Sequence, residues 1–264
     1  MRHPRRLFVT GGSGFLGRHI VDGPASEGWE VIAPTSRSLD LRDAVSVHEM
    51  IAGRQPAAII HTAYRKDDRT SIVDASRHVA SAAARCGARL VHVSTDALFA
   101  GRLAPYTEAD EPTAVHDYGR DKADAEREVA AACPSAVIVR TSLLYGVHEL
   151  SGHERAVRDA VSGTSSMTFF TDEVRSALLV DDLAVALVAL ADRSEPSGVL
   201  NLTGPDPLSR AELATMTARR HGWDASRLRF STIEESGMTR PGHVVLDSTL
   251  AAGHGLEVRG PASW

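Results

Sequence analysis

A tyrosine and a lysine stand four residues apart in the segment Asp117–Lys122. Residues at positions i and i+4 of a helix share a face, so a helix here places Tyr118 beside Lys122. A nearby ammonium group stabilises the phenolate form of tyrosine, which lets the phenol exchange a proton with a carbonyl or carbinol oxygen near neutral pH. The pair therefore predicts proton transfer, with Tyr118 as the general acid.

A glycine-rich turn, Thr10–Gly17, precedes this pair in the chain. It follows the apolar run Leu7–Val9, which is typical of a buried strand, and leads into a helix expected from about Phe15. Small residues at such a junction allow a tight turn and a close approach of backbone to a pyrophosphate, whose charge the helix N-terminus attracts. A nicotinamide dinucleotide held there would supply a hydride, so the two motifs together predict an oxidoreductase. We expect cofactor contacts from Gly11, Ser13, Gly14, Phe15, Leu16 and Gly17.

The end of the second expected strand distinguishes NADP from NAD. An acidic residue there would bind the ribose hydroxyls, whereas a basic residue accepts the 2′-phosphate. The segment has no acid but carries Ser36 and Arg37, which favours NADP, with NAD as the alternative. Asp40 is a candidate acceptor for the adenine amino group or a helix cap, although Asp43 fits capping better.

Composition narrows the class of protein. The chain has 264 residues and a net charge of -5, so general affinity for nucleic acid or for anionic membranes is not expected. The two cysteines and 12 histidines show no metal-ligand spacing, and we predict no metal site. The apolar run Leu7–Val9 is too short for a signal peptide or a membrane span, so we expect a cytoplasmic protein with reduced thiols.

Apolar strand-like runs alternate with helical patterns through the first part of the chain. This alternation predicts an α/β fold with a doubly wound parallel sheet of the Rossmann type, because parallel strands need crossover helices and are buried on both faces. The expected strands are 7–9, 30–33, 57–60, 89–93 and 136–139, and the clearest expected helices are 42–52, 71–85 and 118–132.

The pattern changes after Gly146, where we place a domain boundary. Residues 1–146 are expected to form the NAD(P)-binding domain, and residues 147–264 a smaller, mainly substrate-binding lobe, with 177–202 packing back on the Rossmann sheet. Residues 150–168 are polar and end in small residues, without a predicted element. Residues 177–180 are expected as a strand, with Asp181 or Asp182 capping a helix to 191 and with Ser209 opening a capping box.

These motifs, taken in order, resemble the extended short-chain dehydrogenase/reductase family, and its dTDP-4-dehydrorhamnose reductase branch in particular. The resemblance covers most of the chain. Besides the glycine turn and Leu39–Leu41, the matching segments are Ile60–Tyr64, Val93–Asp96, Pro105–Glu108, Tyr118–Lys122, Arg140–Gly146 and Arg240–Asp247.

The resemblance implies roles for individual residues. Thr95 would hydrogen-bond the substrate oxygen, Tyr118 would be the general acid, and Lys122 would hold the nicotinamide ribose. Further implied cofactor contacts are Asp40, Leu41, Thr62, Ala63 and Tyr64, and implied substrate contacts are Thr141, Ser142, Arg175 and Arg240. For Arg175 the alternative to a phosphate contact is a surface ion pair with Asp172 or Glu173.

The chain also departs from the branch where a sugar nucleotide would lie. Leu143 replaces a typical aromatic, and the short stretch 147–170 lacks an Asn-Phe element. Ala97 follows Thr95–Asp96 in place of a second acid, which disfavours a dehydratase.

The leading functional hypothesis is NADPH-dependent reduction of a ketone, with the 4-keto group of a nucleotide-activated deoxysugar as the expected target. The alternatives are a nucleotide-sugar epimerase and a non-catalytic NADP-binding subunit similar to the regulatory subunit of methionine adenosyltransferase. Members of the family commonly dimerise through helices, which makes a homodimer one option.

Overall fold

The computed structural model of this chain describes residues 5–263, with the side chain of Pro24 left aside. Contacts between residues divide it into two compact units. Unit 1 holds residues 5–95, 117–140 and 183–200, and unit 2 holds residues 96–116, 141–182 and 201–263.

Among the described residues, unit 1 is built on a six-stranded sheet in the order β10-β5-β4-β3-β1-β2. Strand β1 pairs in parallel with β2 and β3, and β4 pairs in parallel with β3 and β5. The predicted α/β fold with a doubly wound parallel sheet is confirmed. The strands are β1 (Arg5–Thr10), β2 (Trp29–Ile32), β3 (Ala58–His61), β4 (Arg89–Val93), β5 (Val137–Arg140) and β10 (Gly198–Asn201).

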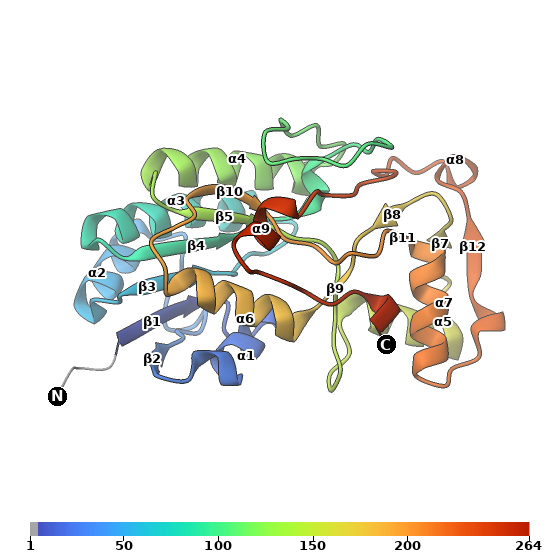
Figure 1. Ribbon diagram of the computed structural model, residues 1–264, viewed down its shortest axis with the longest axis horizontal. Helices are drawn as coiled ribbons and strands as arrows, with labels where there is room; N and C mark the ends of the chain where they lie inside the picture. The colour runs from blue at the N-terminus through green and yellow to red at the C-terminus, as the bar shows by residue number, and fades with distance from the viewer. Residues whose placement is uncertain (1–4, 264) are drawn as a thin grey trace. The chain divides into compact units, whose positions relative to one another are not determined.

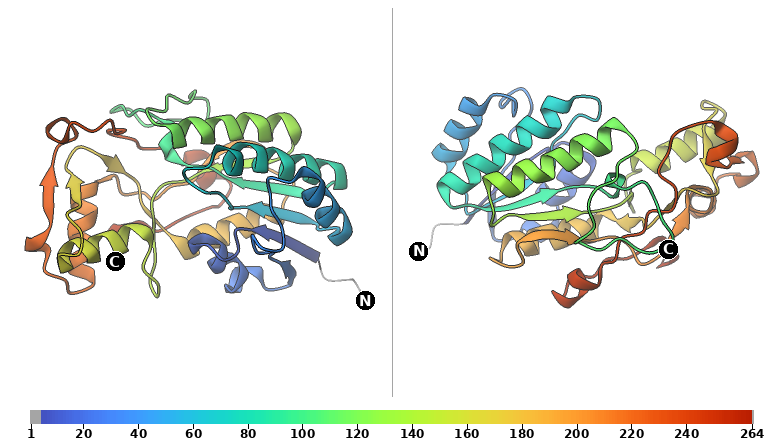
Figure 2. Two further views of the ribbon diagram at one scale, coloured as in Figure 1. Left: turned by 180° about the vertical axis from the view of Figure 1, so that it is seen from behind. Right: turned by 90° about the horizontal axis from the view of Figure 1, so that it is seen from above.

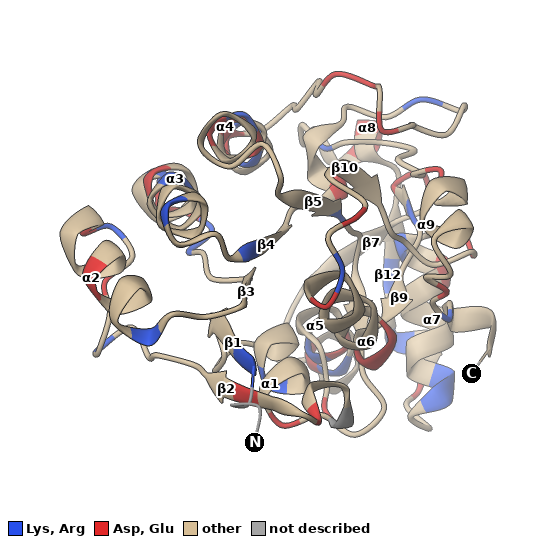
Figure 3. Cartoon of the chain, turned by 60° about the vertical axis from the view of Figure 1, so that its left-hand side comes forward, with Lys and Arg blue, Asp and Glu red and all other residues tan. Residues whose placement is uncertain are grey.

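Helices cover both faces of this sheet. Helices α2, α3 and α4 lie side by side on one face, and α1 and α6 lie on the other (Figures 1, 2 and 3). Because both faces are covered, every residue of β3 and β5 is buried, as their apolar sequences require. The helices are α1 (Phe15–Val21), α2 (Ala44–Arg54), α3 (Arg69–Cys86), α4 (Asp117–Ala132) and α6 (Val180–Ala191), with a 3-10 turn η1 (Pro24–Ser26).

Local signals explain where the helices of unit 1 begin and end. The Asp43 carboxylate accepts hydrogen bonds from the backbone N–H groups of Val45 and Ser46, which confirms the predicted cap of α2. Asp68 caps α3 in the same way, and Gly87 ends that helix in the left-handed conformation.

Helix α4 is anchored to β5 by a buried ion pair. The Glu126 carboxylate lies 2.8 Å from a guanidinium nitrogen of Arg140, and both side chains are less than a tenth exposed. Glu126 follows Lys122 by one helical turn, so this pair also sets the position of the predicted proton-transfer face.

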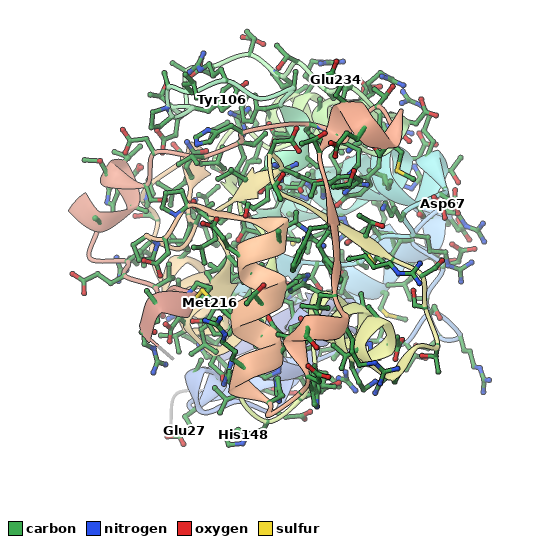
Figure 4. All side chains as sticks on the ribbon, turned by 90° about the vertical axis from the view of Figure 1, so that its right-hand side faces the viewer. Glu27, Asp67, Tyr106, His148, Met216 and Glu234 are labelled. Carbon is green, nitrogen blue, oxygen red and sulfur yellow. The ribbon has the colours of Figure 1, made fainter. Side chains whose placement is uncertain are left out.

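Unit 2 is built from two-stranded pairings and short helices. Strand β7 pairs with β12, β8 with β11 and β6 with β9. Helices α5 and α7, the latter marked by Met216 in Figure 4, enclose a core that includes Val157, Phe169 and Ala214. The strands are β6 (Leu144–Tyr145), β7 (Thr168–Phe170), β8 (Val174–Arg175), β9 (Leu178–Leu179), β11 (Leu208–Ser209) and β12 (Arg229–Ser231). The helices are α5 (Gly152–Ser162), α7 (Arg210–Arg220), α8 (Ile233–Ser236) and α9 (Thr249–Gly253), with 3-10 turns η2 (Asp96–Leu98), η3 (Ala225–Arg227) and η4 (Pro261–Ser263).

Two local expectations for this region are wrong. The polar stretch 150–168 contains helix α5, because Ser151 and Glu154 form a capping box and Val157 and Val161 supply a buried face. Helix α6 begins at Val180, so Asp181 and Asp182 lie within its first turn and neither is the N-cap residue. Asp182 forms an ion pair with Arg259 at 2.7 Å. By contrast, the capping box predicted at Ser209 is present.

Within residues 5–263, no helix is long and apolar enough to cross a lipid bilayer.

The buried ion pair yields a stability prediction. Glu126→Ala should lower the free energy of unfolding by about 3–5 kcal/mol, because Arg140 would keep a buried charge without its partner. Urea unfolding followed by circular dichroism would measure the loss. Glu128→Ala is the control, because Glu128 lies on the same helix but is 44% exposed beside Arg77, and its removal should cost less than about 1 kcal/mol. Equal losses from the two substitutions would contradict the assignment.

Candidate active site

The glycine turn joins β1 to α1 with a geometry suited to a pyrophosphate. The Gly14 N–H donates to the Gly11 carbonyl at 2.8 Å, which closes the turn. Gly14 is the N-cap residue of α1, and no side chain caps this helix. The first backbone N–H groups of α1, which include those of Phe15 and Leu16, can therefore serve an anion. The cofactor contacts of Ser13, Phe15 and Leu16 stay predictions.

Two glycines of the turn have no room for a side chain. Gly11 has a φ of +74°, and a Cβ atom there would lie 2.6 Å from Thr62 Oγ1 and 2.9 Å from the Ala63 Cα. A Cβ on Gly17 would overlap the Gly11 carbonyl oxygen. The turn thus packs directly against the segment after β3, which brings the predicted cofactor residues Thr62 and Ala63 to the turn.

The residues predicted to select NADP lie on the surface after β2. Ser36 and Arg37 are exposed in a turn, accessible to a ligand. Asp40 is exposed and forms an ion pair with Arg42 at 2.8 Å, and the hydrogen bonds from Arg42 lower the pKa of the carboxyl to about 2. The Leu41 carbonyl lies 3.0 Å from His78 Nδ1. Their contacts with a cofactor stay predictions.

The predicted proton-transfer pair lies on α4 together with an aromatic neighbour. Lys122 Nζ donates to the Val93 carbonyl at 2.7 Å and lies 5.5 Å from the centre of the Tyr64 ring. The Tyr64 and Tyr118 rings lie 5.6 Å apart between centroids. Lys66, which sequence reasoning missed, places its ammonium 5.8 Å from the centre of the Tyr118 ring. The structure therefore brings Tyr64, Tyr118 and Lys122 together at the carboxyl end of β4.

The ammonium group of Lys122 is buried and has a lowered pKa. Its side chain is buried, and this burial lowers the pKa of its ammonium to about 8, with Glu126 partly opposing the shift. At neutral pH the group remains mostly protonated. A buried cation interacts strongly with nearby groups because little water screens it.

The third predicted catalytic residue, Thr95, follows β4 directly and is half-buried. The preceding residue continues the parallel pairing, since the Ser94 N–H donates to the Val139 carbonyl at 2.7 Å. Thr95 therefore stands at the carboxyl edge of the sheet, where ligands bind in folds of this type. Its catalytic role stays a prediction.

The predicted substrate residues Ser142 and Arg175 lie in a buried polar cluster of unit 2. Ser142 donates to the Asp96 carboxylate at 2.5 Å, and Arg175 Nε lies 3.7 Å from the same carboxylate. Arg175 also lies 3.4 Å from the Glu173 carboxylate and donates to the Gly242 and Pro241 carbonyls. The ion pair with Glu173, which was the alternative to a phosphate contact, is therefore present, but it is buried rather than on the surface because Arg175 is only 5% exposed.

Arg240 also pairs with Glu173 in this network. Its guanidinium donates to both Glu173 oxygens, at 2.5 and 3.0 Å, while 37% of the side chain remains exposed. Arg210, missed in the sequence, is also buried, and burial lowers its pKa to about 10. Asp96 is buried as well, and burial raises its pKa. Thr141, also predicted, is buried and accepts the Asp96 N–H through its carbonyl.

Among the described residues, no three His, Cys, Asp or Glu side chains gather as a metal ion would require.

Comparison with known proteins assigns the family. The family model described as the RmlD substrate binding domain matches residues 5–259, almost the whole chain. The chain belongs to the RmlD substrate binding domain family. It is 31% identical over 265 residues to dTDP-4-dehydrorhamnose reductase of Mycolicibacterium smegmatis, a match that spans 96% of this chain and 81% of the relative.

Other relatives of this RmlD-family chain include a protein with a different name and a solved reductase structure. Methionine adenosyltransferase 2 subunit beta of Xenopus laevis is also 31% identical, over 97% of this chain and 84% of its own length. The crystal structure of dTDP-4-dehydrorhamnose reductase from Bacillus anthracis, in complex with NADP, superimposes with a TM-score of 0.89 at 24% identity. That comparison covers 99% of this chain and 97% of the other, and supports the fold assignment.

The tight packing of Gly11 generates a binding prediction. Gly11→Ala should weaken binding of a nicotinamide dinucleotide at least about tenfold, because the turn must shift away from Thr62 and the positive φ disfavours alanine. Fluorescence titration with NADPH would measure the change. Gly53→Ala is the control, because Gly53 lies in α2 in open space and alanine there should stabilise the fold by about 0.5–1 kcal/mol. Unchanged affinity in Gly11→Ala would contradict the packing argument.

The lowered pKa of Lys122 generates a pH prediction. The unfolded chain binds this proton more tightly, with a pKa near 10.4 against about 8 in the fold, so the cost of burying the charge is complete below pH 8. The cost fades as pH rises from 8 to about 10.4. Relative to Lys122→Met, which has no group that titrates here, the parent should therefore gain stability on the order of 3 kcal/mol as pH rises from 8 to about 10.4. Parallel urea titrations across this range would test it, and a difference independent of pH would refute it.

Proposed function

We propose that this chain is an NADPH-dependent reductase that converts a ketone to an alcohol, with the 4-keto group of a nucleotide-activated deoxysugar as substrate. The grouping of Tyr64, Tyr118 and Lys122 at the carboxyl edge of β4 carries the proposal. The glycine turn lies in the same unit and supports a dinucleotide there. Membership of the RmlD family supports a nucleotide-sugar substrate.

In this mechanism, a nicotinamide dinucleotide, when bound, supplies the hydride that forms the new C–H bond at the carbonyl carbon. Thr95 donates a hydrogen bond to the carbonyl oxygen and orients it. Tyr118 gives its phenolic proton to that oxygen as the C=O π bond breaks, which leaves a phenolate. The positive charge of Lys122 stabilises the phenolate until water returns the proton, and the same ammonium is available to the nicotinamide ribose.

The choice of NADP over NAD rests on the residues after β2. Exposed Arg37, next to Ser36, is suited to a 2′-phosphate, and no acid stands among residues 33–37. NAD is the alternative cofactor.

The buried polar cluster of unit 2 supports a phosphate-bearing substrate. Three arginines, Arg175, Arg210 and Arg240, stand against two acids, Asp96 and Glu173, so the cluster has an excess of one positive charge. Arg240 is the most exposed of them and can reach a phosphate bidentately. Arg175 donates hydrogen bonds to the Gly242 and Pro241 carbonyls. In this proposal Arg175, Ser142 and Thr141 also contact the substrate.

The proposal extends to the organisation of the protein. Residues 1–146 would bind the cofactor and residues 147–264 mainly the substrate, with 177–202 packing on the Rossmann sheet. We further propose a cytoplasmic protein without nucleic-acid or membrane partners, for which a homodimer is one option.

A second candidate is a non-catalytic NADP-binding subunit. The 31% identity to methionine adenosyltransferase 2 subunit beta supports it, since this value equals the identity to the mycobacterial reductase. The presence of Thr95, Tyr118 and Lys122 together argues for catalysis. An epimerase would use the same residues but would consume no NADPH overall.

A measurement of NADPH oxidation distinguishes these functions. The purified chain should oxidise NADPH in the presence of a dTDP-4-keto-6-deoxysugar, and Tyr118→Phe should reduce kcat by a factor of about 10²–10⁴ while binding NADPH with near-parental affinity. Leu103→Ala is a control, since that side chain is 87% exposed. Near-normal kcat in Tyr118→Phe would disprove the mechanism. NADPH binding without oxidation, across a panel of keto sugars and simple ketones, would favour the subunit.

A further inference from the structure

His61, the last residue of β3, is buried and uses both ring nitrogens. Nδ1 lies 2.6 Å from Thr10 Oγ1, and Nε2 lies 3.2 Å from Ser76 Oγ. Thr10 is the last residue of β1, and Ser76 lies within α3. One imidazole therefore connects the strand that enters the glycine turn with a helix that covers the sheet.

The partners determine which nitrogen carries the proton. Ser76 Oγ lies 2.5 Å from the Ile72 carbonyl, which can only accept, so the Ser76 hydroxyl donates there and accepts from His61 Nε2–H. His61 Nδ1 must then accept from the Thr10 hydroxyl. Burial lowers the pKa of His61 to about 3, with the charge of Lys122 adding to the effect, so the ring is neutral and this direction of donors holds at physiological pH.

One end of this chain of hydrogen bonds reaches the glycine turn. Thr10 Oγ1 accepts from the Ala63 N–H at 3.4 Å, and the Thr10 carbonyl accepts from Thr62 Oγ1 at 2.8 Å. Gly11 follows Thr10 and packs against Thr62 and Ala63 without space for a Cβ. A change in how Thr10 is held must therefore move the turn.

The other end reaches the proton-transfer face. Ile72, whose carbonyl accepts from Ser76, belongs to an apolar cluster with Val73 and Ala125. Tyr118 packs against this cluster. A series of hydrogen bonds thus runs from the glycine turn through His61 and Ser76 to Ile72, whose side chain belongs to the apolar cluster that Tyr118 packs against.

We propose that His61 is a positioning residue, which holds the cofactor turn in place through its bond with Thr10 while Ser76 fixes the orientation of the ring. The inference rests on the proposed dinucleotide site, but not on the identity of the substrate. His92, the partner of His61 in the parallel pairing, provides a contrast. It is equally buried, with ring centroids 5.3 Å apart, but neither of its ring nitrogens has a hydrogen-bond partner.

Two substitutions separate the two bonds of His61. In His61→Asn the amide oxygen stands where Nδ1 stood, because both are attached to Cγ, and it can still accept from Thr10. In His61→Gln the longer side chain places its amide nitrogen near the former Nε2, so it can donate to Ser76. Its amide oxygen lies one bond further from Cβ than Nδ1 did, so it no longer meets the Thr10 hydroxyl. Thr10→Val removes the same bond from the other side, together with the longer 3.4 Å bond from the Ala63 N–H. His92→Gln is the matched control.

The experiment is a fluorescence titration of each variant with NADPH, with the melting temperature as a check of folding. We expect His61→Gln and Thr10→Val each to raise the dissociation constant about tenfold, since each removes the buried hydrogen bond between His61 and Thr10. The double variant Thr10→Val/His61→Gln should bind NADPH no more weakly than Thr10→Val alone, because Thr10→Val has already removed the bond that His61→Gln removes. His61→Asn and His92→Gln should stay within about threefold of the parent.

Other results would overturn the proposal. These are parental affinity in His61→Gln, equal weakening in His61→Asn or His92→Gln, or additive losses in the double variant. The titration needs no substrate. If the variants show the expected NADPH affinities but the protein reduces no keto sugar, the role of His61 is upheld and the proposed reaction is refuted. A parent protein that binds neither NADPH nor NADH would refute both.

Discussion

The buried ammonium of Lys122 is the constraint on which the rest of the candidate site depends. A charge in a low-dielectric interior is costly unless opposite charges and carbonyl dipoles surround it. Here the Val93 carbonyl accepts from the ammonium, and Glu126 lies one helical turn further along α4. Glu126 is in turn held by Arg140 on β5, so positive, negative and positive charges alternate from the site into the core. The position of α4 over the sheet, and with it that of Tyr118, follows from this alternation.

Unit 2 meets a similar constraint with a different outcome. Glu173 is shared by Arg175 and Arg240, and Asp96 is shared by Arg175 and Ser142. The two acids cannot neutralise three arginines, so the cluster retains positive charge after its internal pairs have formed. Such an arrangement is suited to an anionic ligand, because the negative charge of a phosphate would balance the remaining positive charge.

Family membership alone does not decide between catalysis and regulation. The chain is as similar to methionine adenosyltransferase 2 subunit beta as to a dTDP-4-dehydrorhamnose reductase, at 31% identity over nearly its full length in both cases. Function resides in the site, and the fold is shared by proteins with different roles. The residues that bear on the question are therefore Thr95, Tyr118 and Lys122, together with the buried charges that hold them.

The sequence by itself determined the α/β class and the main elements of unit 1. Apolar runs alternating with helical periods, the glycine turn and the cap at Asp43 are local signals, and each can be read without knowledge of distant contacts. The spacing of Tyr118 and Lys122 likewise required only a helix. Helix α5 escaped notice because its buried face is short and its polar cap resembles a loop.

Only the tertiary structure decided which distant residues meet. The burial of Lys122, the pairing of Glu126 with Arg140 and the network around Glu173 join residues from different elements, and no local pattern encodes their distances. For the same reason the alternative for Arg175, an ion pair on the surface, had the wrong location, since packing buries the pair with Glu173. His61 was recognised only as part of a family motif, and its bonds to Thr10 and Ser76 depend on the register of β1 with β3 and on the docking of α3. Electrostatics and hydrogen bonding depend on separation in space, which the order of residues along a chain specifies only through the completed fold.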